Sequence, residues 1–495
     1  MTVRIADLMN ESGVRFGTSG ARGLVTAMTD RVCYAYTRGF LQMLLDRGDI
    51  RGPLRAAIAG DRRSSTPRIM AAAARAAFDL GFEVLYAGLV PAPAIALFGL
   101  KEAIPTVMVT GSHIPDDRNG IKFNKPTGEI LKSDESDLLG QSIEVPDLFD
   151  RGGALRAGMS LPPPIREIEN DYIRRWTNAV NANALTGKKI VVFGHSAVGR
   201  DILVKVYRSL GADVVASTWS DKFIPVDTEA IRPEDIATAI ELARSHEPFA
   251  IVSTDGDSDR PLISDESGQW LRGDVIGVVA AQWLGADAVV TPVSSNTVVE
   301  RVARFKTVER TKIGSPYVIT AMQEAINRGY QRVVGYEANG GFLTATDISM
   351  PGGPNLTPLP TRDPIIVQLC VLLSAIDAEL SISELMARLP SRYTASDRLE
   401  NFPTSTSQER LANLALAGNN ANAMFSSLIG QVTRIDTTDG VRAVGESGEI
   451  VHLRSSGNAP ELRCYAEAET AVRARQLVAQ ALARCSQWIT NPPNA

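Results

Sequence analysis

The stretch Thr110-Gly-Ser-His-Ile-Pro-Asp-Asp-Arg-Asn-Gly-Ile-Lys-Phe123 is where the fold of this chain can first be inferred. The apolar, β-branched run Ile104 to Val109 comes directly before it and predicts a buried strand. Glycine and proline residues then exclude a regular element, so Ser112 and His113 are expected in a loop at the carboxyl end of that strand. In open α/β sheets, ligands bind at this end of the strands.

A serine hydroxyl is a poor nucleophile unless a base, a metal ion or a prior modification activates it. His113 and Lys122 lie on the same stretch and could polarise a group or transfer a proton. Taken alone, the stretch fits a polar turn between two elements equally well. The rest of the sequence has to decide between these two interpretations.

The composition is that of an ordinary globular protein, with 44% hydrophobic and 22% charged residues in a chain of 495. This length predicts two to four domains. The net charge of −5 argues against a nucleic-acid partner. No apolar run reaches the roughly 18 residues that a membrane helix needs, so we expect no membrane partner.

The sequence also predicts a cytoplasmic location. Its first residues, Met1 to Gly13, carry charged side chains and lack the apolar core of a signal peptide. The four cysteines, Cys33, Cys370, Cys464 and Cys485, show no C-x-x-C spacing and fit buried thiols in a reducing compartment.

The first 155 residues predict an α/β domain. Arg15-Phe-Gly-Thr-Ser-Gly-Ala-Arg-Gly23 is a glycine-rich loop ahead of an amphipathic helix, Asp30 to Leu45, and strands and helices then alternate. The glycines let a ligand approach the backbone, and Arg22 offers a planar fork of donors suited to phosphate. A structural turn explains the same glycine pattern, so both interpretations stay open.

The alternation of strands and helices starts again twice, which predicts two more α/β units with mixed sheets at residues 160–265 and 266–390. Residues 391–495 differ, because closely spaced short strands and a final helix from Thr470 predict an antiparallel sheet in an α+β domain. The expected fold is therefore three similar α/β domains followed by a C-terminal α+β domain.

Asp255, Asp257 and Asp259 alternate with small residues directly after the predicted strand Phe249 to Ser253. A turning backbone can aim alternate carboxylates at one point, and hard oxygen ligands suit Mg²⁺. A calcium-hand loop is excluded because this loop follows a strand and has no Glu at the twelfth position. Three carboxylates so close repel one another without a cation, so a magnesium site is favoured over a solvated turn.

Two further loops offer polar groups of other kinds. Glu337 and Asn339 follow the predicted strand that ends at Val334, and this acceptor and amide suit sugar hydroxyls, although an ordinary polar turn fits equally well. Near the end of the chain, Arg454 and the backbone N–H groups around Gly457 could form a phosphate cradle.

Taken together and in this order, the loops resemble those of the α-D-phosphohexomutase family. The motifs lie about a domain apart: the serine loop at 110–123, Asp-Gly-Asp-x-Asp-Arg at 255–260, Glu-x-x-Gly-Gly at 337–341 and Arg-x-Ser-Gly at 454–457. The opening Gly-Thr-Ser-Gly-x-Arg-Gly stretch and the turn Asp439-Gly-Val-Arg442 match as well. The resemblance covers essentially the whole chain.

The resemblance implies four domains, 1–155, 160–265, 266–390 and 391–495, each contributing one loop to a central cleft. It implies an intramolecular phosphotransferase, an isomerase that interconverts hexose 6-phosphate and hexose 1-phosphate through a phosphoserine and a hexose 1,6-bisphosphate. Mg²⁺ would be the cofactor, hexose phosphates the partners, and the chain a monomer or homodimer.

Residue roles follow from the same resemblance. Ser112 would be the phosphoserine and would bind Mg²⁺ together with Asp255, Asp257 and Asp259. Catalysis would also use His113, Lys122 and Arg22 for proton transfer and charge stabilisation. The expected substrate-binding residues are Arg260 beside the metal, Gly314 and Ser315 in a specificity turn, Glu337 and Asn339 at the sugar hydroxyls, and Arg454, Ser456, Gly457 and Asn458 at the distal phosphate.

Several positions depart from the family's usual pattern and leave the identity of the sugar open. Ile114 stands where Asn is common, Asn339 where Ser is usual, and Gly-Asn-Ala-Pro at 457–460 where Gly-Thr-Glu-Pro is commoner. In the turn Thr311-Lys-Ile-Gly-Ser-Pro-Tyr317, Ser315 replaces the His of many mannose-capable members.

We therefore rank phosphomannomutase activity first, phosphoglucomutase second and phosphoglucosamine mutase third. A catalytically inactive regulator that only binds sugar phosphates is the alternative from another class. It is disfavoured because a binder would need neither the nucleophile nor the metal-binding set.

Overall fold

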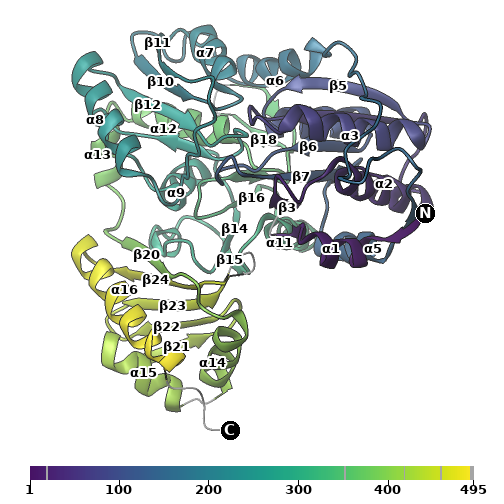
Figure 1. The fold of residues 1–495 in the computed structure, drawn as a ribbon. Helices are drawn as coiled ribbons and strands as arrows, with labels where there is room; N and C mark the ends of the chain where they lie inside the picture. Colours follow the sequence, from purple (N-terminus) through teal and green to yellow (C-terminus); the bar gives the residue numbers. More distant parts are fainter. Residues whose placement is uncertain (18–19, 351–352, 417–418, 457–459, 491–495) are drawn as a thin grey trace.

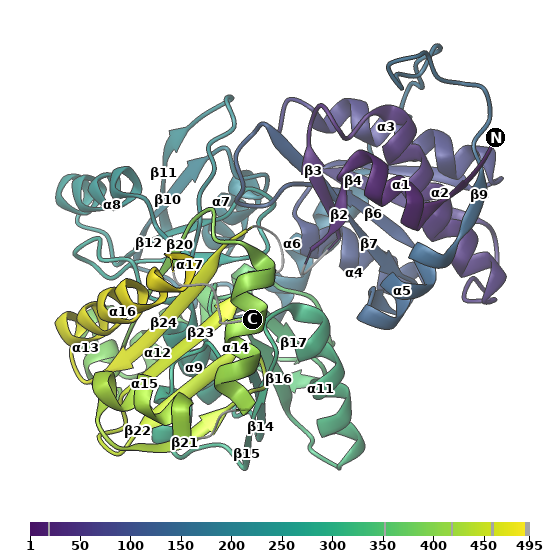
Figure 2. The ribbon, with the colours of Figure 1, turned by 60° about the horizontal axis from the view of Figure 1, so that its bottom comes forward.

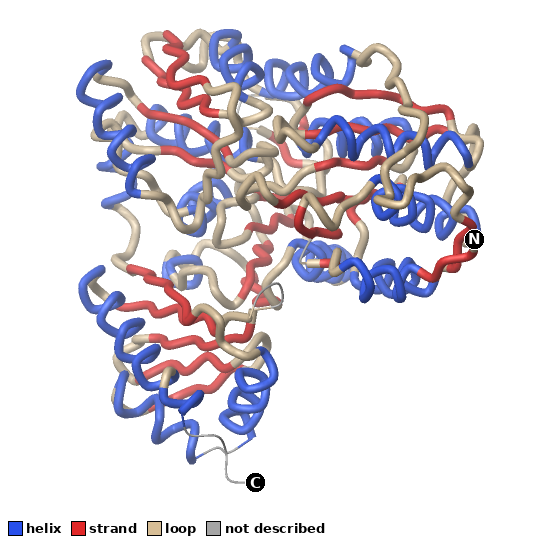
Figure 3. Tube along the Cα trace, in the orientation of Figure 1, coloured by secondary structure: helices blue, strands red, loops and turns tan. Residues whose placement is uncertain are grey.

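The computed structural model describes residues 1–495 except 18–19, 351–352, 417–418, 457–459 and 491–495. In this described part, four larger sheets follow one another along the chain, and two short two-stranded sheets accompany them. Helices lie along each of the larger sheets (Figure 3). The first three sheets form the upper body of the molecule, and the fourth extends from it (Figure 1).

The first sheet has the order β2-β3-β7-β6-β4-β5, with β8 paired to β7. Its strands are β2 (Arg15–Phe16), β3 (Ala21–Leu24), β4 (Arg55–Gly60), β5 (Glu83–Leu89), β6 (Thr106–Val109), β7 (Arg118–Lys125) and β8 (Gly128–Glu129). The accompanying helices are α1 (Ile5–Ser12), α2 (Asp30–Asp46), α3 (Thr66–Asp79), α4 (Ala92–Glu102) and α5 (Lys132–Gly140). A separate pair joins β1 (Thr2–Arg4) to β9 (Ser142–Glu144).

The second sheet has the order β11-β10-β12-β13, and the third repeats this topology as β15-β14-β16-β17. The second unit consists of α6 (Arg166–Ala179), β10 (Lys189–His195), α7 (Arg200–Ser209), β11 (Asp213–Trp219), α8 (Pro233–His246), β12 (Ala250–Thr254) and β13 (Pro261–Ile263). The third consists of α9 (Gly273–Trp283), β14 (Ala288–Pro292), α10 (Val298–Arg301), β15 (Thr307–Thr311), α11 (Ser315–Asn327), β16 (Val333–Tyr336), β17 (Phe342–Thr344), β18 (Ile348–Ser349), β19 (Asn355–Leu356), α12 (Pro364–Asp377) and α13 (Ile382–Ala387).

The fourth sheet is antiparallel throughout, with the order β20-β24-β23-β22-β21. Helices α14, α15 and α16 lie on the same face of it, the one turned to the viewer in Figure 2. Its elements are β20 (Tyr393–Leu399), α14 (Thr404–Leu416), α15 (Asn419–Ile429), β21 (Val432–Asp436), β22 (Val441–Gly445), β23 (Ile450–Ser455), β24 (Leu462–Ala468), α16 (Ala471–Cys485) and α17 (Gln487–Thr490).

The same strand pattern occurs in all of the first three sheets. β5-β4-β6-β7 repeats the two later sheets: the first two neighbouring pairs are parallel, and the last strand is antiparallel to the third. A short connection therefore leaves the carboxyl end of the third strand and returns as the fourth. The serine, three-Asp and Glu337 loops are these three connections.

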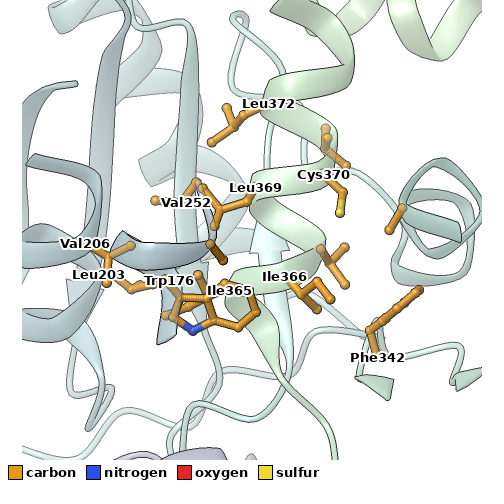
Figure 4. Packing of buried hydrophobic residues seen from close by; sticks show 14 of the residues in the cluster. Trp176, Leu203, Val206, Val252, Phe342, Ile365, Ile366, Leu369, Cys370 and Leu372 are labelled. Atoms are coloured by element: carbon orange, nitrogen blue, oxygen red, sulfur yellow. The ribbon is translucent and has the colours of Figure 1, made fainter. Parts of the chain in front are cut away.

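Helix α12 joins the second and third sheets. Its residues are almost all buried, and Ile365, Leu369 and Leu372 lie among side chains from the second unit, including Trp176 (Figure 4). The amide of Gln368 donates to the carbonyl oxygens of Ser253 at 2.6 Å and of Leu262 at 3.0 Å. These bonds anchor the helix on both strands that flank the three-Asp loop.

The expected fold class, three α/β units and an α+β unit, is confirmed. The residue limits given for the four domains stay a prediction. None of the helices in the described part of the chain combines the length and apolar character needed to cross a membrane. Cys33, Cys370, Cys464 and Cys485 are buried and form no disulfide.

Candidate active site

Ser112 lies three residues after the end of β6, in a tight turn of the first connection. Its backbone is left-handed, with φ of +56°, a conformation that non-glycine residues rarely adopt. The backbone N–H of Ser112 donates to the hydroxyl of Thr110 at 2.8 Å, which stabilises this turn. The serine side chain is fully buried, so its hydroxyl is directed at protein groups rather than at bulk water.

The three-Asp loop connects β12 to β13 and contains its own left-handed residue, Ser258, with φ of +54°. The hydroxyl of Ser258 bonds the hydroxyl of Thr254 at 2.8 Å and accepts from the backbone N–H of Gly199 at 2.9 Å. One side-chain oxygen from each of the aspartates lies within 4.8 Å of the other two, and all three residues are buried. The predicted convergence of the carboxylates is therefore present.

Ser112 and the three-Asp loop meet directly, although 143 residues separate them along the chain. The Ser112 hydroxyl donates to Asp255 Oδ2 at 2.6 Å. Burial, together with the neighbouring charges of Asp257 and Asp259, raises the pKa of Asp255 well above its usual value. The site thus concentrates negative charge at the point where the nucleophile stands.

Lys122, on β7, partly neutralises this charge. Its ammonium group donates to Asp257 Oδ2 at 2.6 Å and to Asp259 Oδ2 at 2.5 Å. Burial acts to raise the pKa of Asp259, but Arg362, Lys122 and Arg260 outweigh it and lower that pKa. Two of the three carboxylates are therefore held in the ionised form.

The donor set fits Mg²⁺. Within the part of the chain that is described, the Oδ1 atoms of Asp257 and Asp259 are buried and accept no hydrogen bond. Buried carboxylate oxygens without donors are costly unless a cation balances them. With Asp255 and the adjoining Ser112 hydroxyl, they form a set of hard oxygen ligands of the kind that Mg²⁺ prefers.

His113 lies against Arg260 and not only beside Ser112. Arg260 Nη1 donates to His113 Nδ1 at 2.8 Å, while the Ser112 hydroxyl is 3.5 Å from the same nitrogen. Burial and the charge of Arg260 lower the pKa of His113 to about 3, so the imidazole is neutral at pH 7. Its Nε2 is 3.9 Å from Asp227 Oδ2, a carboxylate that the sequence did not single out.

Glu337 lies in the third connection, between β16 and β17, and reaches the metal-binding residues through Arg362. Arg362 Nη1 donates to Glu337 Oε2 at 3.0 Å, and its Nε donates to Asp259 Oδ2 at 3.0 Å. Asn339 instead organises its own loop, because its Oδ1 accepts from the N–H of Gly341 at 2.9 Å. Its carbonyl accepts from the Thr228 hydroxyl at 2.7 Å.

Arg362 is an active-site residue that sequence reasoning missed. It follows a long Gly- and Pro-rich loop and precedes α12, and neither position carries a recognisable motif. Its importance comes from two partners, Asp259 and Glu337, which lie 103 and 25 residues away. Only a signal for spatial contact could have identified it.

Arg22, on β3, shares the electrostatic environment of this site. Burial and the nearby charge of Arg260 lower the pKa of Arg22 to about 10, while Asp257 and Asp259 act in the opposite direction. At neutral pH the guanidinium stays charged. Arg22 therefore adds positive charge to the environment of these carboxylates, and its catalytic role stays a prediction.

Ser315 begins α11, after Gly314, whose backbone has φ of +132°. The Ser315 side chain is fully buried, and its hydroxyl donates to Glu129 Oε2 at 2.8 Å. Thr361 donates to the other oxygen of Glu129 at 2.5 Å. The proton of the Ser315 hydroxyl is therefore committed to Glu129, and the substrate-binding roles of Gly314 and Ser315 stay predictions.

The predicted phosphate loop belongs to the fourth sheet. Arg454, on β23, pairs with Asp439 at 3.3 Å, and the other oxygen of Asp439 accepts from the N–H of Ile313 at 2.9 Å. This contact ties the loop to the turn that contains Gly314. Ser456 is buried, while Gly457 and Asn458 lie outside the described residues.

Models of one protein family match all four units. Phosphoglucomutase/phosphomannomutase α/β/α domains I, II and III match residues 13–147, 170–268 and 272–393, and the C-terminal domain of the same family matches residues 399–484. The matched regions together cover most of the chain.

Two relatives are similar over almost their whole length. A phosphomannomutase of Salmonella muenchen is 42% identical over 94% of both chains. A phosphomannomutase of Sinorhizobium fredii is 41% identical over 95% of this chain and 98% of its own.

Solved structures share the fold at lower identity. A phosphoglucomutase/phosphomannomutase family protein of Burkholderia thailandensis superposes with a TM-score of 0.73 at 18% identity, over 98% of this chain and 99% of its own. An Aspergillus fumigatus N-acetylphosphoglucosamine mutase in complex with glucose 1,6-bisphosphate gives 0.58 at 15% identity, over 97% of this chain and 98% of its own.

Proposed function

Because the chain belongs to the phosphoglucomutase/phosphomannomutase family, we propose that it interconverts the 6-phosphate and 1-phosphate of a hexose through a phosphorylated Ser112, with mannose as the preferred sugar. The family assignment makes it a phosphohexomutase, an isomerase that acts by phosphoryl transfer. The choice of mannose is supported by the names of the relatives that are 42% and 41% identical.

One observation carries the proposal: the Ser112 hydroxyl lies 2.6 Å from Asp255 in a cluster of three buried carboxylates. A protein that merely binds sugar phosphates would gain nothing from a serine held in a strained backbone against a cation site. An enzyme that carries a phosphoryl group on this serine needs both. Mg²⁺, when bound there, would supply positive charge that balances the phosphate oxygens.

In the proposed cycle, the bond from phosphorus to Ser112 Oγ breaks as a bond to a hydroxyl oxygen of the hexose monophosphate forms. The hydroxyl proton leaves to a nearby base, and the product is a 1,6-bisphosphate. After the bisphosphate reorients, its other phosphoryl group returns to Ser112 Oγ. Lys122, Arg260 and Arg22 would stabilise the charge on the moving group, and His113, held neutral beside the Ser112 hydroxyl by burial and by Arg260, would help to position that hydroxyl.

Reorientation requires one fixed anchor for the phosphate that is not transferred. We assign this anchor to Arg454, Ser456, Gly457 and Asn458, and we assign the hydroxyl contacts to Glu337 and Asn339. Arg454 is nine-tenths buried and already paired with Asp439, so it is preorganised for an anion. Gly314 and Ser315 would influence which sugar fits, because their turn is bonded to Asp439 and to Glu129.

The buried, unpaired cysteines support a reducing, cytoplasmic location. Whether the enzyme acts as a monomer or homodimer can be measured by light scattering coupled to size-exclusion chromatography.

The decisive experiment is a coupled assay on the 1-phosphates of mannose, glucose and glucosamine, each with its 1,6-bisphosphate as activator. We expect kcat/KM to be highest for mannose 1-phosphate. A higher value for glucose or glucosamine would assign the preference to that sugar. Mass analysis of the peptide containing Ser112 should show one added phosphoryl group after incubation with bisphosphate, and its absence there would refute the phosphoserine mechanism.

A further inference from the structure

Arg63 lies in the loop between β4 and α3 and has its side chain fully buried beneath the serine loop. Its Nη2 donates to the carbonyl oxygens of Ser112 at 2.9 Å and Ile114 at 2.5 Å. Its Nη1 donates to the carbonyl oxygens of Pro115 at 2.7 Å and Arg118 at 2.9 Å. Four carbonyl groups of one loop thus converge on a single guanidinium.

The remaining N–H of this guanidinium is also bonded, because Nε donates to Asp61 Oδ2 at 3.1 Å. Arginine has five side-chain N–H donors, and here each has an acceptor. Asp61 is buried as well and accepts from the hydroxyls of Thr110 at 2.7 Å and Thr66 at 2.7 Å. The Thr110 hydroxyl accepts from the backbone N–H of Ser112. Asp61 therefore stabilises the turn through Thr110 before Ser112, and Arg63 stabilises it through the carbonyl groups of Ser112 and the residues after it.

The face of the Arg63 guanidinium packs on a side chain from the second unit. The carbon at its centre lies 3.9 Å from the centroid of the Phe223 ring. A Cβ placed on Gly256 of the three-Asp loop would come within 2.9 Å of the same ring and 2.7 Å of the Ser112 carbonyl oxygen. Phe223 therefore contacts both the residue that holds the serine loop and the loop that carries the carboxylates.

From this geometry we infer that Arg63 and Phe223 form a positioning device, which sets the distance between the Ser112 hydroxyl and the carboxylates across the boundary of the first two units. The inference rests on the proposed role of Ser112 as the phosphorylated residue. Neither side chain touches the transferred group. They act through the Ser112 carbonyl and the three-Asp loop.

The role is specific for arginine. A lysine has three donors on one tetrahedral nitrogen, so it cannot reach four carbonyl groups and a carboxylate, and it offers no flat face to the ring. Arg63→Lys keeps the positive charge but loses the fixed geometry. Displacing a reacting group by about 1 Å can cost on the order of 100-fold in rate.

The test is the single-turnover rate at which a hexose 1,6-bisphosphate phosphorylates Ser112. This rate is measured from the increase in mass of the intact protein, by mass spectrometry. We expect Arg63→Lys to slow this step by about 100-fold and Phe223→Leu by about 10-fold, with the bisphosphate concentration for half-maximal rate within about threefold of wild type. The double variant should lose less than the product of the two effects, because both changes remove one shared contact.

Arg68→Lys is the matched control. Arg68 lies on α3 of the same unit and likewise bonds a carboxylate, Asp30, and the carbonyl groups of Val25 and Met28, which belong to a different loop. In the Arg68→Lys variant, the rate of Ser112 phosphorylation should stay within about twofold of wild type.

A merely structural role would lower the melting temperature without slowing phosphorylation of the folded fraction, and that result would overturn the inference. If Arg63→Lys does not fold, Phe223→Leu decides alone, and a wild-type rate in that variant refutes the device. Failure of the wild-type enzyme to gain a phosphoryl group would instead refute the proposed function, so the two failures are distinguishable.

Discussion

The β12–β13 loop and the β16–β17 loop occupy the same place in two sheets of identical topology, yet they hold different chemistry. Both leave a buried parallel strand, turn through a left-handed residue and return as the antiparallel edge strand. That residue is Ser258 in the first loop and Gly340 in the second. The repeated backbone therefore places each loop at the same point of its sheet, and the side chains on the loop determine its chemistry.

The two loops carry different numbers of carboxylates, and these are paired with different numbers of basic side chains. The first loop concentrates three buried carboxylates that require Lys122, Arg260 and Arg362, and they leave two oxygens that accept no hydrogen bond in the described part of the chain. The second presents one carboxylate, Glu337, held by Arg362. The three carboxylates of the first loop favour a bound cation, while contact with sugar hydroxyls stays the proposed role of Glu337 in the second loop. Arg362 couples the two.

The serine loop is the third loop in this position, and loss of the Ser112 hydroxyl should have the largest effect on turnover. We expect Ser112→Ala to lower turnover by at least about 1000-fold, because the proposed cycle carries the phosphoryl group on this hydroxyl. Turnover in the coupled assay with added bisphosphate measures this loss. Ser64→Ala, at an exposed serine that donates to Asp116 of the same stretch, should leave turnover unchanged. Near-normal turnover of Ser112→Ala would place the nucleophile elsewhere.

Loss of one negative charge from the three-Asp loop should have the second largest effect on activity. In Asp257→Asn we expect the Mg²⁺ concentration for half-maximal activity to rise by about 100-fold. The amide binds Mg²⁺ more weakly than the carboxylate, and its hydrogen bond with Lys122 is weaker as well. Titrating Mg²⁺ at saturating substrate measures the shift. Asp265→Asn changes a buried carboxylate of the same unit that accepts backbone N–H groups, and its Mg²⁺ dependence should match wild type. An unaltered Mg²⁺ requirement in Asp257→Asn would show that this carboxylate does not bind the cation.

The equivalent change in the β16–β17 loop should have a smaller and different effect. Glu337→Gln keeps the size of the side chain but weakens its bond to Arg362, so we expect turnover to fall by about 10-fold and the ranking of sugars to change. The Mg²⁺ requirement should stay near wild type. Kinetics on mannose and glucose 1-phosphates measure both quantities. Asp287→Asn is the control, because Asp287 lies directly before β14, at the amino-terminal end of the parallel strands, whereas Glu337 follows the carboxyl end of β16. If Glu337→Gln acted only through Mg²⁺, the distinction between the two loops would fail.

The smallest effect concerns the helix that locks the two sheets together. Burial raises the pKa of Asp363, directly before α12, from 3.8 to about 6. A pKa raised in the folded state means that this carboxyl group destabilises the fold increasingly as the pH rises from about 4 to about 6. Asp363→Asn keeps the acceptor for the Tyr172 hydroxyl and for the N–H of Ile365 but removes the charge.

Relative to wild type, the Asp363→Asn variant should therefore gain about 1 kcal/mol more stability at pH 8 than at pH 5. Melting temperatures at the two pH values report the difference, and Asp147→Asn, which changes a highly exposed side chain in the same way, is the control. A gain that is larger at pH 5 would contradict the sign of the shift.

Local sequence was sufficient wherever the signal lies within a few residues. The β-branched run before Thr110, the alternating aspartates from Asp255 to Asp259 and the closely spaced strands after residue 391 each predicted the correct element or loop. These signals are local because strand formation, turn chemistry and the spacing of like charges depend on neighbours in the chain. The sequence by itself therefore determined the fold class and the set of loops.

Tertiary structure alone decided which partners meet. Arg362 joins Asp259 to Glu337, Arg63 gathers four carbonyl groups of the serine loop, and Ser315 faces Glu129. Two of these pairings, Arg362 with Asp259 and Ser315 with Glu129, depend on how neighbouring units pack against each other, and they join residues 103 and 186 positions apart. Arg63 meets the serine loop within the first unit, where the fold of one sheet brings two connections together. No local pattern encodes such a distance, because the energy that fixes it comes from buried contacts such as those of α12 between the sheets.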